Sequence, residues 1–183
     1  RGNHEVMMRG TFANIRIKNE ILPGTEGGLT KSFISNGIMP IYDASQEYLK
    51  NNIDTVIIAG KEYGTGSSRD WAAKGTRLLG VKAVIAESFE RIHRSNLIGM
   101  GVLPLEFLDD KNRNNLNIKG DEKVSIIGIN NLTPNKVLKC KINGKKDILI
   151  NLKCRIDTNK ELEYYKAGGI LNFVLNEIIS NAA

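Results

Sequence analysis

The sequence predicts an α/β fold, in which a parallel sheet is flanked by helices and followed by an additional antiparallel β section. Up to residue 107, apolar β-branched segments alternate with helical patterns. This order is typical of parallel strands that are connected by covering helices. From residue 123 to residue 152, short apolar segments alternate with turns that contain Asn or Gly, which favours antiparallel strands.

Length and composition indicate a single globular domain. The 183 residues are enough for one well-buried core, and 41% hydrophobic with 25% charged residues is ordinary. The chain has no internal repeat and no low-complexity linker, so residues 1–183 are expected to form one domain. No segment approaches the roughly 20 consecutive apolar residues that a membrane span requires, and we therefore expect a soluble protein with no membrane partner.

The elements of the parallel part follow from local patterns. Strands are expected at residues 12–17, 55–59, 83–86 and 102–107, and helices at residues 42–51, 68–79 and 89–100. The segment 55–59 is uniformly apolar and largely β-branched. It is therefore expected to be the central strand of the sheet and to be buried on both faces.

The antiparallel section and the last helix complete the expected fold. Strands are expected at residues 124–127, 137–142 and 148–152, and Asn143-Gly144 is a strong signal for a two-residue hairpin turn. A final helix is expected to begin near Gly169 and to turn its apolar residues toward the core. These residues are Ile170, Leu171, Val174, Leu175, Ile178 and Ile179.

The segment 63–70, Tyr-Gly-Thr-Gly-Ser-Ser-Arg-Asp, carries the strongest chemical signal. It lies between an expected strand and an expected helix, where unpaired N–H groups and the positive helix end favour carboxylates and phosphates. Gly64 and Gly66 support the loop by permitting positive φ, and the guanidinium of Arg69 can bind a carboxylate through two hydrogen bonds. Ser67 and Asp70 also fit a capping box, in which the serine only caps the helix.

Residues 59–75 closely resemble the active-site loop of the C-terminal, swivelling domain of aconitase, in the branch with bacterial aconitase A and the iron regulatory proteins. Further similar strings lie at residues 1–7, 9–16, 88–97, 101–105, 155–158 and 168–171. The resemblance implies a swivelling β/β/α-type domain. The chain is too short for a whole aconitase and opens at Arg1 within a family motif, so we expect it to be a fragment of a larger enzyme.

The resemblance also implies the chemistry. It makes Ser67 the catalytic base and assigns binding of the substrate carboxylate to Ser68 and Arg69, in a hydro-lyase that interconverts citrate and isocitrate through cis-aconitate. The isolated domain would hold half an active site and be inactive. Mitochondrial-type relatives continue the motif with Glu-His where this chain has Asp70-Trp71. That departure puts the branch in question, not the reaction.

Cys140 and Cys154 are the two cysteines of the chain. A [4Fe–4S] cluster needs several converging thiolates, so the cluster that the family implies must be bound outside this chain, which is expected to hold no metal. Isolated cysteines are usually small buried apolar residues. Two of them do not form a disulfide framework, which favours a reducing compartment. We therefore expect a cytoplasmic protein, or one of the mitochondrial matrix in a eukaryote.

Two alternative functions stay open. The domain can be the RNA-binding lobe of an iron regulatory protein, or the small subunit of isopropylmalate isomerase, which has a similar Gly-Ser-Ser-Arg loop. The net charge of +6 fits steering of a tricarboxylate, nucleic-acid binding or a bias of composition alone. His93 lies on an expected helix among apolar residues and is expected to be a structural core residue rather than a ligand or base.

Overall fold

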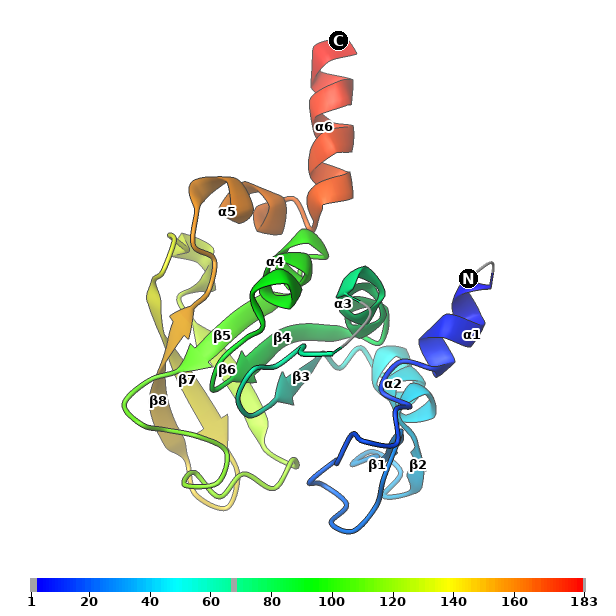
Figure 1. Cartoon of the computed structure of the whole chain (residues 1–183). Coiled ribbons are helices and arrows are strands. Elements are labelled where there is room, and N and C mark those ends of the chain that lie inside the picture. Colours follow the sequence, from blue (N-terminus) through cyan, green and yellow to red (C-terminus); the bar gives the residue numbers. More distant parts are fainter. Residues whose placement is uncertain (1–2, 67–68, 183) are drawn as a thin grey trace.

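The computed structural model describes residues 3–66 and 69–182. Within these residues the chain forms a two-stranded sheet near the N-terminus and a six-stranded mixed sheet, and two helices pack on one face of the larger sheet (Figure 1). The strands are β1 (Leu29–Lys31), β2 (Ile38–Pro40), β3 (Thr55–Ile58), β4 (Val81–Ala86), β5 (Leu103–Phe107), β6 (Lys123–Ile127), β7 (Val137–Asn143) and β8 (Ile148–Cys154). The helices are α1 (His4–Arg9), α2 (Ile41–Lys50), α3 (Arg69–Leu78), α4 (Arg91–Gly99), the 3-10 turn η1 (Ile129–Asn131), α5 (Asn159–Lys166) and α6 (Ile170–Ala182).

The parallel half of the main sheet is formed by β3, β4 and β5, which are connected through α3 and α4. Val84 on β4 lies in one buried cluster with Ala73 of α3 and Leu97 of α4, so the two helices cover the same face of this half. The strands expected at 55–59, 83–86 and 102–107 and the three helices expected beside them are therefore confirmed, with small shifts at their ends.

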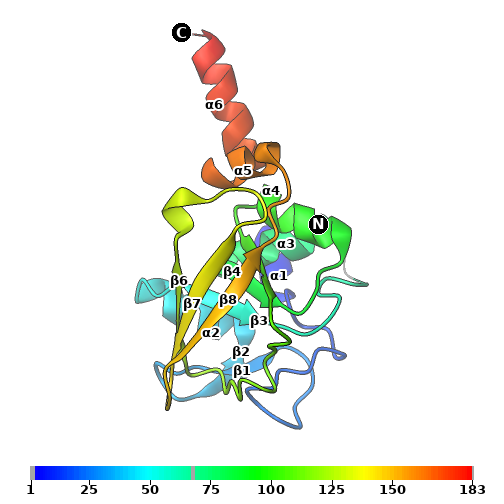
Figure 2. The same cartoon turned by 90° about the vertical axis from the view of Figure 1, so that its left-hand side faces the viewer.

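The antiparallel half continues from β5, which pairs in parallel with β4 and antiparallel with β8. The order of the main sheet is β3-β4-β5-β8-β7-β6, and Figure 2 shows the long strands β7 and β8 edge to edge. Cys140 and Cys154 are fully buried within this half, as expected for small apolar core residues. Burial raises the pKa of the Cys140 thiol to about 11, which keeps it protonated at neutral pH.

The strand expected at residues 12–17 is not formed, and this prediction was wrong. Phe12 adopts a left-handed conformation with φ 63°. The backbone N–H of Ile17 donates to the carbonyl of Asn14, and the side chain of Asn14 accepts a hydrogen bond from the N–H of Arg16. These local bonds close a turn that competes with strand pairing, and alternating apolar residues alone did not reveal it.

The expectation that residues 55–59 form the central strand was also wrong. Strand β3 is the first in the order of the main sheet, with β4 as its neighbour. All four of its residues are only half-buried. No strand of the described chain pairs with the other edge of β3, so the uniformly apolar composition of β3 does not correspond to full burial.

The two-residue hairpin expected at Asn143-Gly144 is replaced by a longer connection. Asn143 still belongs to β7 and pairs with Lys123 of β6, while the last β7–β8 pair joins Ile142 to Ile148. Residues 144–147 therefore connect the strands. The pairing of Asn143 with Lys123 of β6 keeps it in the sheet, and this pairing overrides the local turn signal.

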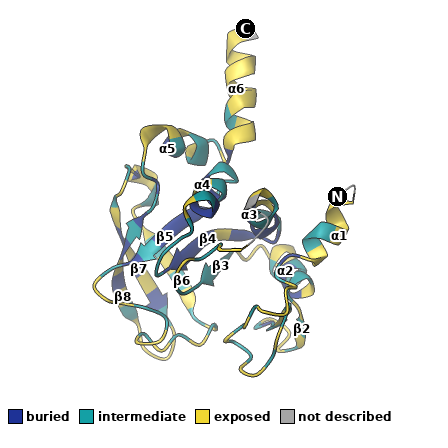
Figure 3. Cartoon of the chain, viewed as in Figure 1, coloured by how far each residue is buried: buried dark blue, intermediate teal, exposed yellow. Residues whose placement is uncertain are grey.

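The last helix is present as α6, but its apolar residues do not face the core. It extends from the top of the domain away from all other elements in both views (Figures 1 and 2). Figure 3 shows α6 as exposed over almost its whole length, whereas β4 and β5 are largely buried. The expectation of a core-facing helix was therefore wrong, because no described element lies beside α6 beyond its first turn.

The start of α6 is fixed by close contact between two glycine pairs. Helix α5 ends at Lys166 with Ala167 as its C-cap, and the following residue Gly168 has φ +81°, as expected of a left-handed residue after a helix end. Gly101 follows α4 with φ +75°, and a Cβ at this position would lie 2.6 Å from the carbonyl oxygen of Gly168. A Cβ at Gly169 would similarly lie 2.9 Å from the carbonyl oxygen of Gly99. Side chains larger than hydrogen would push the two segments apart.

We therefore expect Gly101→Ala to reduce the free energy of unfolding by more than Gly24→Ala. Both positions have positive φ, but a Cβ at Gly24 meets nothing within 4 Å. The left-handed conformation costs a non-glycine residue about 1–2 kcal/mol, and the clash at Gly101 adds about 1–3 kcal/mol. Urea unfolding of both variants measures the difference, and equal losses would show that the contact with Gly168 is not tight.

Candidate active site

The loop between β3 and α3 lies at the carboxyl ends of the parallel strands, the edge of such sheets where ligands usually bind. It runs alongside the segment that follows β4. The N–H of Tyr63 donates to the carbonyl of Ser88 at 2.9 Å, and the N–H of Glu90 donates to the carbonyl of Tyr63 at 2.9 Å. Pairing with a second segment fixes the path of the loop.

Local hydrogen bonds hold the tip of the loop. The N–H of Glu62 donates to Oγ of Ser88 at 2.8 Å, and Oγ1 of Thr65 donates to the carbonyl of Glu62 at 2.9 Å. Glu62 has a left-handed conformation with φ 52°. Lys61 and Glu62 are exposed, which agrees with solvated side chains rather than a buried pair. The loop is therefore shaped by its backbone and by Ser88, and these two charged side chains remain accessible.

Tyr63 anchors the loop to the helices. Its side chain makes a hydrogen bond with Thr76 on α3, and burial raises the pKa of Tyr63 well above its usual value. Its ring packs edge-on against Phe89 and against His93, with centroids 6.1 Å and 5.3 Å away. This aromatic cluster joins the loop to α3 and α4.

His93 lies directly beneath the loop. It is 2% exposed, and its backbone N–H donates to Oε2 of Glu90 at 2.7 Å, which caps α4. A Cβ at Gly64 would lie 2.3 Å from the His93 ring, and Gly64 has φ +100°. His93 is thus a core residue, as expected, and its contact requires glycine at position 64. The sequence did not indicate that these two residues touch.

The residues expected to carry the chemistry fall at the start of α3. Ser67 and Ser68 lie outside the described residues. Arg69 is the first residue of α3, and Asp70 is the acidic residue of its first turn. Oδ1 of Asp70 accepts a hydrogen bond from Nδ2 of Asn96 on α4 at 3.1 Å. The backbone thus has the expected order of strand, Gly-containing loop and helix start, with Gly66 at φ +76°.

Arg113 supports the beginning of the loop and was not found from the sequence. Its guanidinium lies beside Gly60, where a Cβ would be 2.9 Å from Nη1. It donates to Glu87 at 3.0 Å and to both carboxylate oxygens of Glu20, at 2.8 and 3.0 Å. Hydrogen bonds from Arg113 lower the pKa of Glu20. The region 109–151 lacks a distinctive motif, so this link between distant segments had no signal in the sequence.

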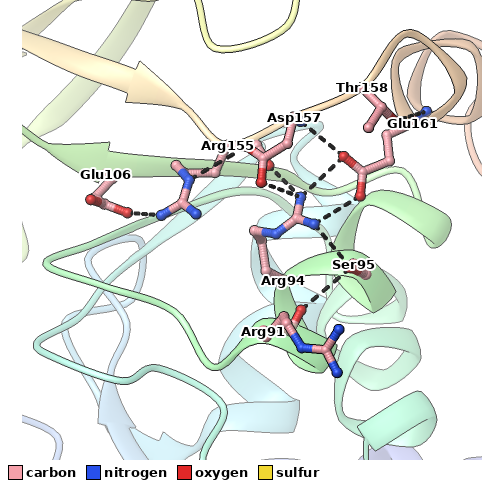
Figure 4. A network of polar contacts seen from close by, with 8 residues as sticks. All are labelled: Arg91, Arg94, Ser95, Glu106, Arg155, Asp157, Thr158 and Glu161. Carbon is pink, nitrogen blue, oxygen red and sulfur yellow. Dashed lines mark hydrogen bonds and ion pairs between the residues drawn. The ribbon is translucent and has the colours of Figure 1, made fainter.

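A buried ion network fixes α4 on its other side (Figure 4). Arg94 is 8% exposed. Its guanidinium donates to both oxygens of Glu161, at 2.8 and 3.1 Å, and to the carbonyl of Arg155 at 2.6 Å. The N–H of Asp157 donates to Glu161 at 2.8 Å. Burial by itself would raise the pKa of Glu161, but hydrogen bonds from Arg94 and from the backbone lower it overall. The motif 155–158 thus joins α4 to α5.

Comparison with known proteins identifies the family. A family model described as the aconitase C-terminal domain matches residues 1–110. The chain belongs to this family. Aconitate hydratase A of Legionella pneumophila is 61% identical over 182 residues, that of Pseudomonas aeruginosa 58% over 183, and that of Escherichia coli 54% over 182. Each alignment covers 98% of this chain and 20% of the relative, so the chain spans about a fifth of their length.

A comparison of structures matches 3-isopropylmalate dehydratase from Methanocaldococcus jannaschii. The TM-score is 0.47 and the sequence identity 23%, and the match covers 79% of this chain and 82% of that one.

The helices in the described part of the chain are all too short or too polar to cross a bilayer.

The described residues do not fit the iron–sulfur cluster that aconitases use. Within residues 3–66 and 69–182, no three His, Cys, Asp or Glu side chains converge as metal ligands. The two thiols are fully buried in the antiparallel half of the sheet. The pKa of Cys140 is raised to about 11, whereas a ligand must be a thiolate.

We expect Gly64→Ala to destabilise the protein through His93, and a double-mutant cycle measures this. Gly66→Ala is the control, because φ there is also positive and a Cβ meets no described atom within 4 Å. The control should cost about 1–2 kcal/mol for the left-handed conformation. Gly64→Ala should cost about 1–3 kcal/mol more. This excess should disappear in a His93→Gly background, because Cβ of His93 itself would lie 2.4 Å from the added Cβ. If the losses of unfolding free energy in the two single variants simply add up in the double variant, the close contact between positions 64 and 93 is contradicted.

His93 is also expected to make the protein less stable in mild acid. Burial lowers the pKa of His93 in the folded state, although the charge of Glu90 opposes this. The unfolded chain therefore binds a proton first as the pH falls below about 6.5, and stability falls by up to about 1.4 kcal/mol per pH unit. Urea unfolding between pH 7.5 and 5.5 should show this slope in the wild type and in His4→Gln, and His93→Gln should lack it. Identical slopes in all three would exclude His93 as the cause.

Proposed function

We propose that this chain is the lobe of an aconitate hydratase that supplies the catalytic base and part of the substrate site. The observation that carries the proposal is the segment 63–70, which follows β3 and whose last two residues begin α3, in a chain that belongs to the aconitase C-terminal domain family. Identities of 54–61% with aconitate hydratases A over 98% of the chain support this reaction.

On this proposal Ser67 is the base that removes a proton from a carbon of citrate or isocitrate, on the way to cis-aconitate. A serine must lose its own proton to act in this way, and an alkoxide is unfavourable in water. The N-terminus of α3 and the N–H groups of its first turn, which have no partner within the helix, are suited to stabilise this negative charge. A negative oxygen at this place would also be stabilised by the nearby cation of Arg69.

Ser68 and Arg69 would bind a carboxylate of the substrate. A carboxylate offers two oxygens in the geometry that a guanidinium matches with two parallel hydrogen bonds. Gly64 and Gly66 would support the loop, Gly64 through its contact with His93. The iron–sulfur cluster and the remaining substrate contacts would come from the rest of the polypeptide, so the isolated chain would be inactive. Bacterial relatives are consistent with a cytoplasmic enzyme.

Kinetics of the full-length enzyme test these roles. Ser67→Ala should lower kcat by about 10²–10⁴ with little change in KM, because general-base catalysis contributes about this factor. Arg69→Lys keeps the charge and loses the bidentate geometry, so KM should rise about tenfold or more, given about 1.5–3 kcal/mol for a hydrogen bond to a charged group. Lys61→Ala is the control, because Lys61 is an exposed loop residue.

The opposite result is equally informative. If Ser67→Ala keeps kcat within a few-fold of the wild type, Ser67 only caps α3 and the base lies elsewhere. If Arg69→Lys leaves KM unchanged, the guanidinium does not bind the substrate carboxylate through two hydrogen bonds.

A further inference from the structure

Helix α6 presents an apolar face that no described part of the chain covers. Six aliphatic residues recur at a spacing that places them on one half of the helix surface. The face consists of Ile170, Leu171, Val174, Leu175, Ile178 and Ile179, which are 39%, 78%, 44%, 54%, 59% and 58% exposed. Glu177 is the one charged residue among residues 170–182. We call this set the apolar face of α6.

The direction of α6 is nevertheless fixed at its start. Phe173 packs edge-on against Tyr164 of α5, with ring centroids 5.1 Å apart, and Nζ of Lys160 lies 4.1 Å from the centre of the Phe173 ring. The glycine contact between Gly101 and Gly168 holds the end of α5 against the end of α4. The first turn of α6 is therefore anchored, and the following turns extend away from the domain (Figures 1 and 2).

A helix in this position needs a partner to be stable. Isolated helices shorter than about 12–15 residues are marginal in water, and α6 has 13 residues. Most helical stability in proteins comes from packing of an apolar face. In α6 only the first turn has such packing, so the remaining turns depend on a surface outside the described chain.

We propose that the apolar face of α6 docks into an apolar groove on the remaining part of the same polypeptide. This inference rests on the proposed function, in which the chain is one lobe of an aconitate hydratase. The relatives are about five times as long as the aligned part, since the chain covers 20% of each. Ample protein surface in the same polypeptide is therefore available to receive the helix.

The size of the face favours this occupant over a second copy of the chain. A helix of 13 residues is only about 20 Å long, whereas association of separate molecules usually needs about 800 Å² of buried surface on each partner. Within one polypeptide the covalent connection provides a high effective concentration. A small apolar contact is then enough to keep the lobe docked.

Hydrogen–deuterium exchange of the α6 amides tests the proposal. We expect exchange from Val174 onward to be at least about tenfold slower in the full-length polypeptide than in the 183-residue chain alone, because docking must precede stable helix formation. Equal exchange in the two proteins would overturn the proposal. A dimer of the 183-residue chain in sedimentation equilibrium, dissociated by Leu175→Glu, would also overturn it in favour of a second copy.

A matched pair of variants in the full-length polypeptide locates the contact. Leu175→Glu and Asn176→Glu each add one negative charge at adjacent positions of the helix, but Asn176 lies on the polar side. Leu175→Glu should remove most of the protection of α6, and Asn176→Glu should keep it. Equal effects of the two variants would overturn the proposal.

A milder variant and a second assay complete the design. Leu175→Ala removes apolar surface while favouring helix formation, so it remains informative if Leu175→Glu prevents folding. Faster exchange in Leu175→Ala supports docking, and slower exchange contradicts it. Hydratase activity is measured in parallel. Activity without protection of α6 overturns the docking alone, and protection without activity overturns the proposed function while supporting the docking.

Discussion

The burial of helix α4 constrains the position of every part of the domain that bears on function. Leu97 and Ile98 are completely buried against the sheet, so the helix can neither rotate nor slide without exposing them. The other sides of α4 contact the site loop, α5 and the base of α6. Residues of this one short helix thus position the site loop, α5 and the start of α6. A displacement of α4 would disturb all three segments.

The contact of α4 with the site loop and its contact with the segment 155–161 differ in physical kind. The loop rests on His93 through van der Waals contact that only glycine at position 64 permits, and the segment 155–161 is held by the charge of Arg94. A buried guanidinium is costly unless it is paired and hydrogen-bonded, and Arg94 has both oxygens of Glu161 and a backbone carbonyl as partners. Such a site tolerates few alternative arrangements, which makes the junction between α4 and α5 specific.

Several features of the fold could be predicted because their signals are local. The helices at 41–50, 69–78 and 91–99 follow from periodic apolar residues, and the strands after residue 123 follow from alternation. The candidate loop was found because its two glycines, two hydroxyls and arginine are contiguous in the sequence. Local signals failed where pairing partners decided the outcome. The apolar run of β3 lies at the edge of the main sheet, and Asn143 is held in β7 by its pairing with Lys123.

By itself the sequence determined the α/β class, the order of most elements, the family resemblance and the position of the candidate loop at the start of a helix. Tertiary structure alone decided that His93 lies under Gly64, that Arg113 links Glu20 to Glu87, and that α6 projects with its apolar face uncovered. The reason is physical. Periodicity reports that a residue is apolar and on which side of its own element it lies, but which surface it meets depends on contacts between residues far apart in the chain.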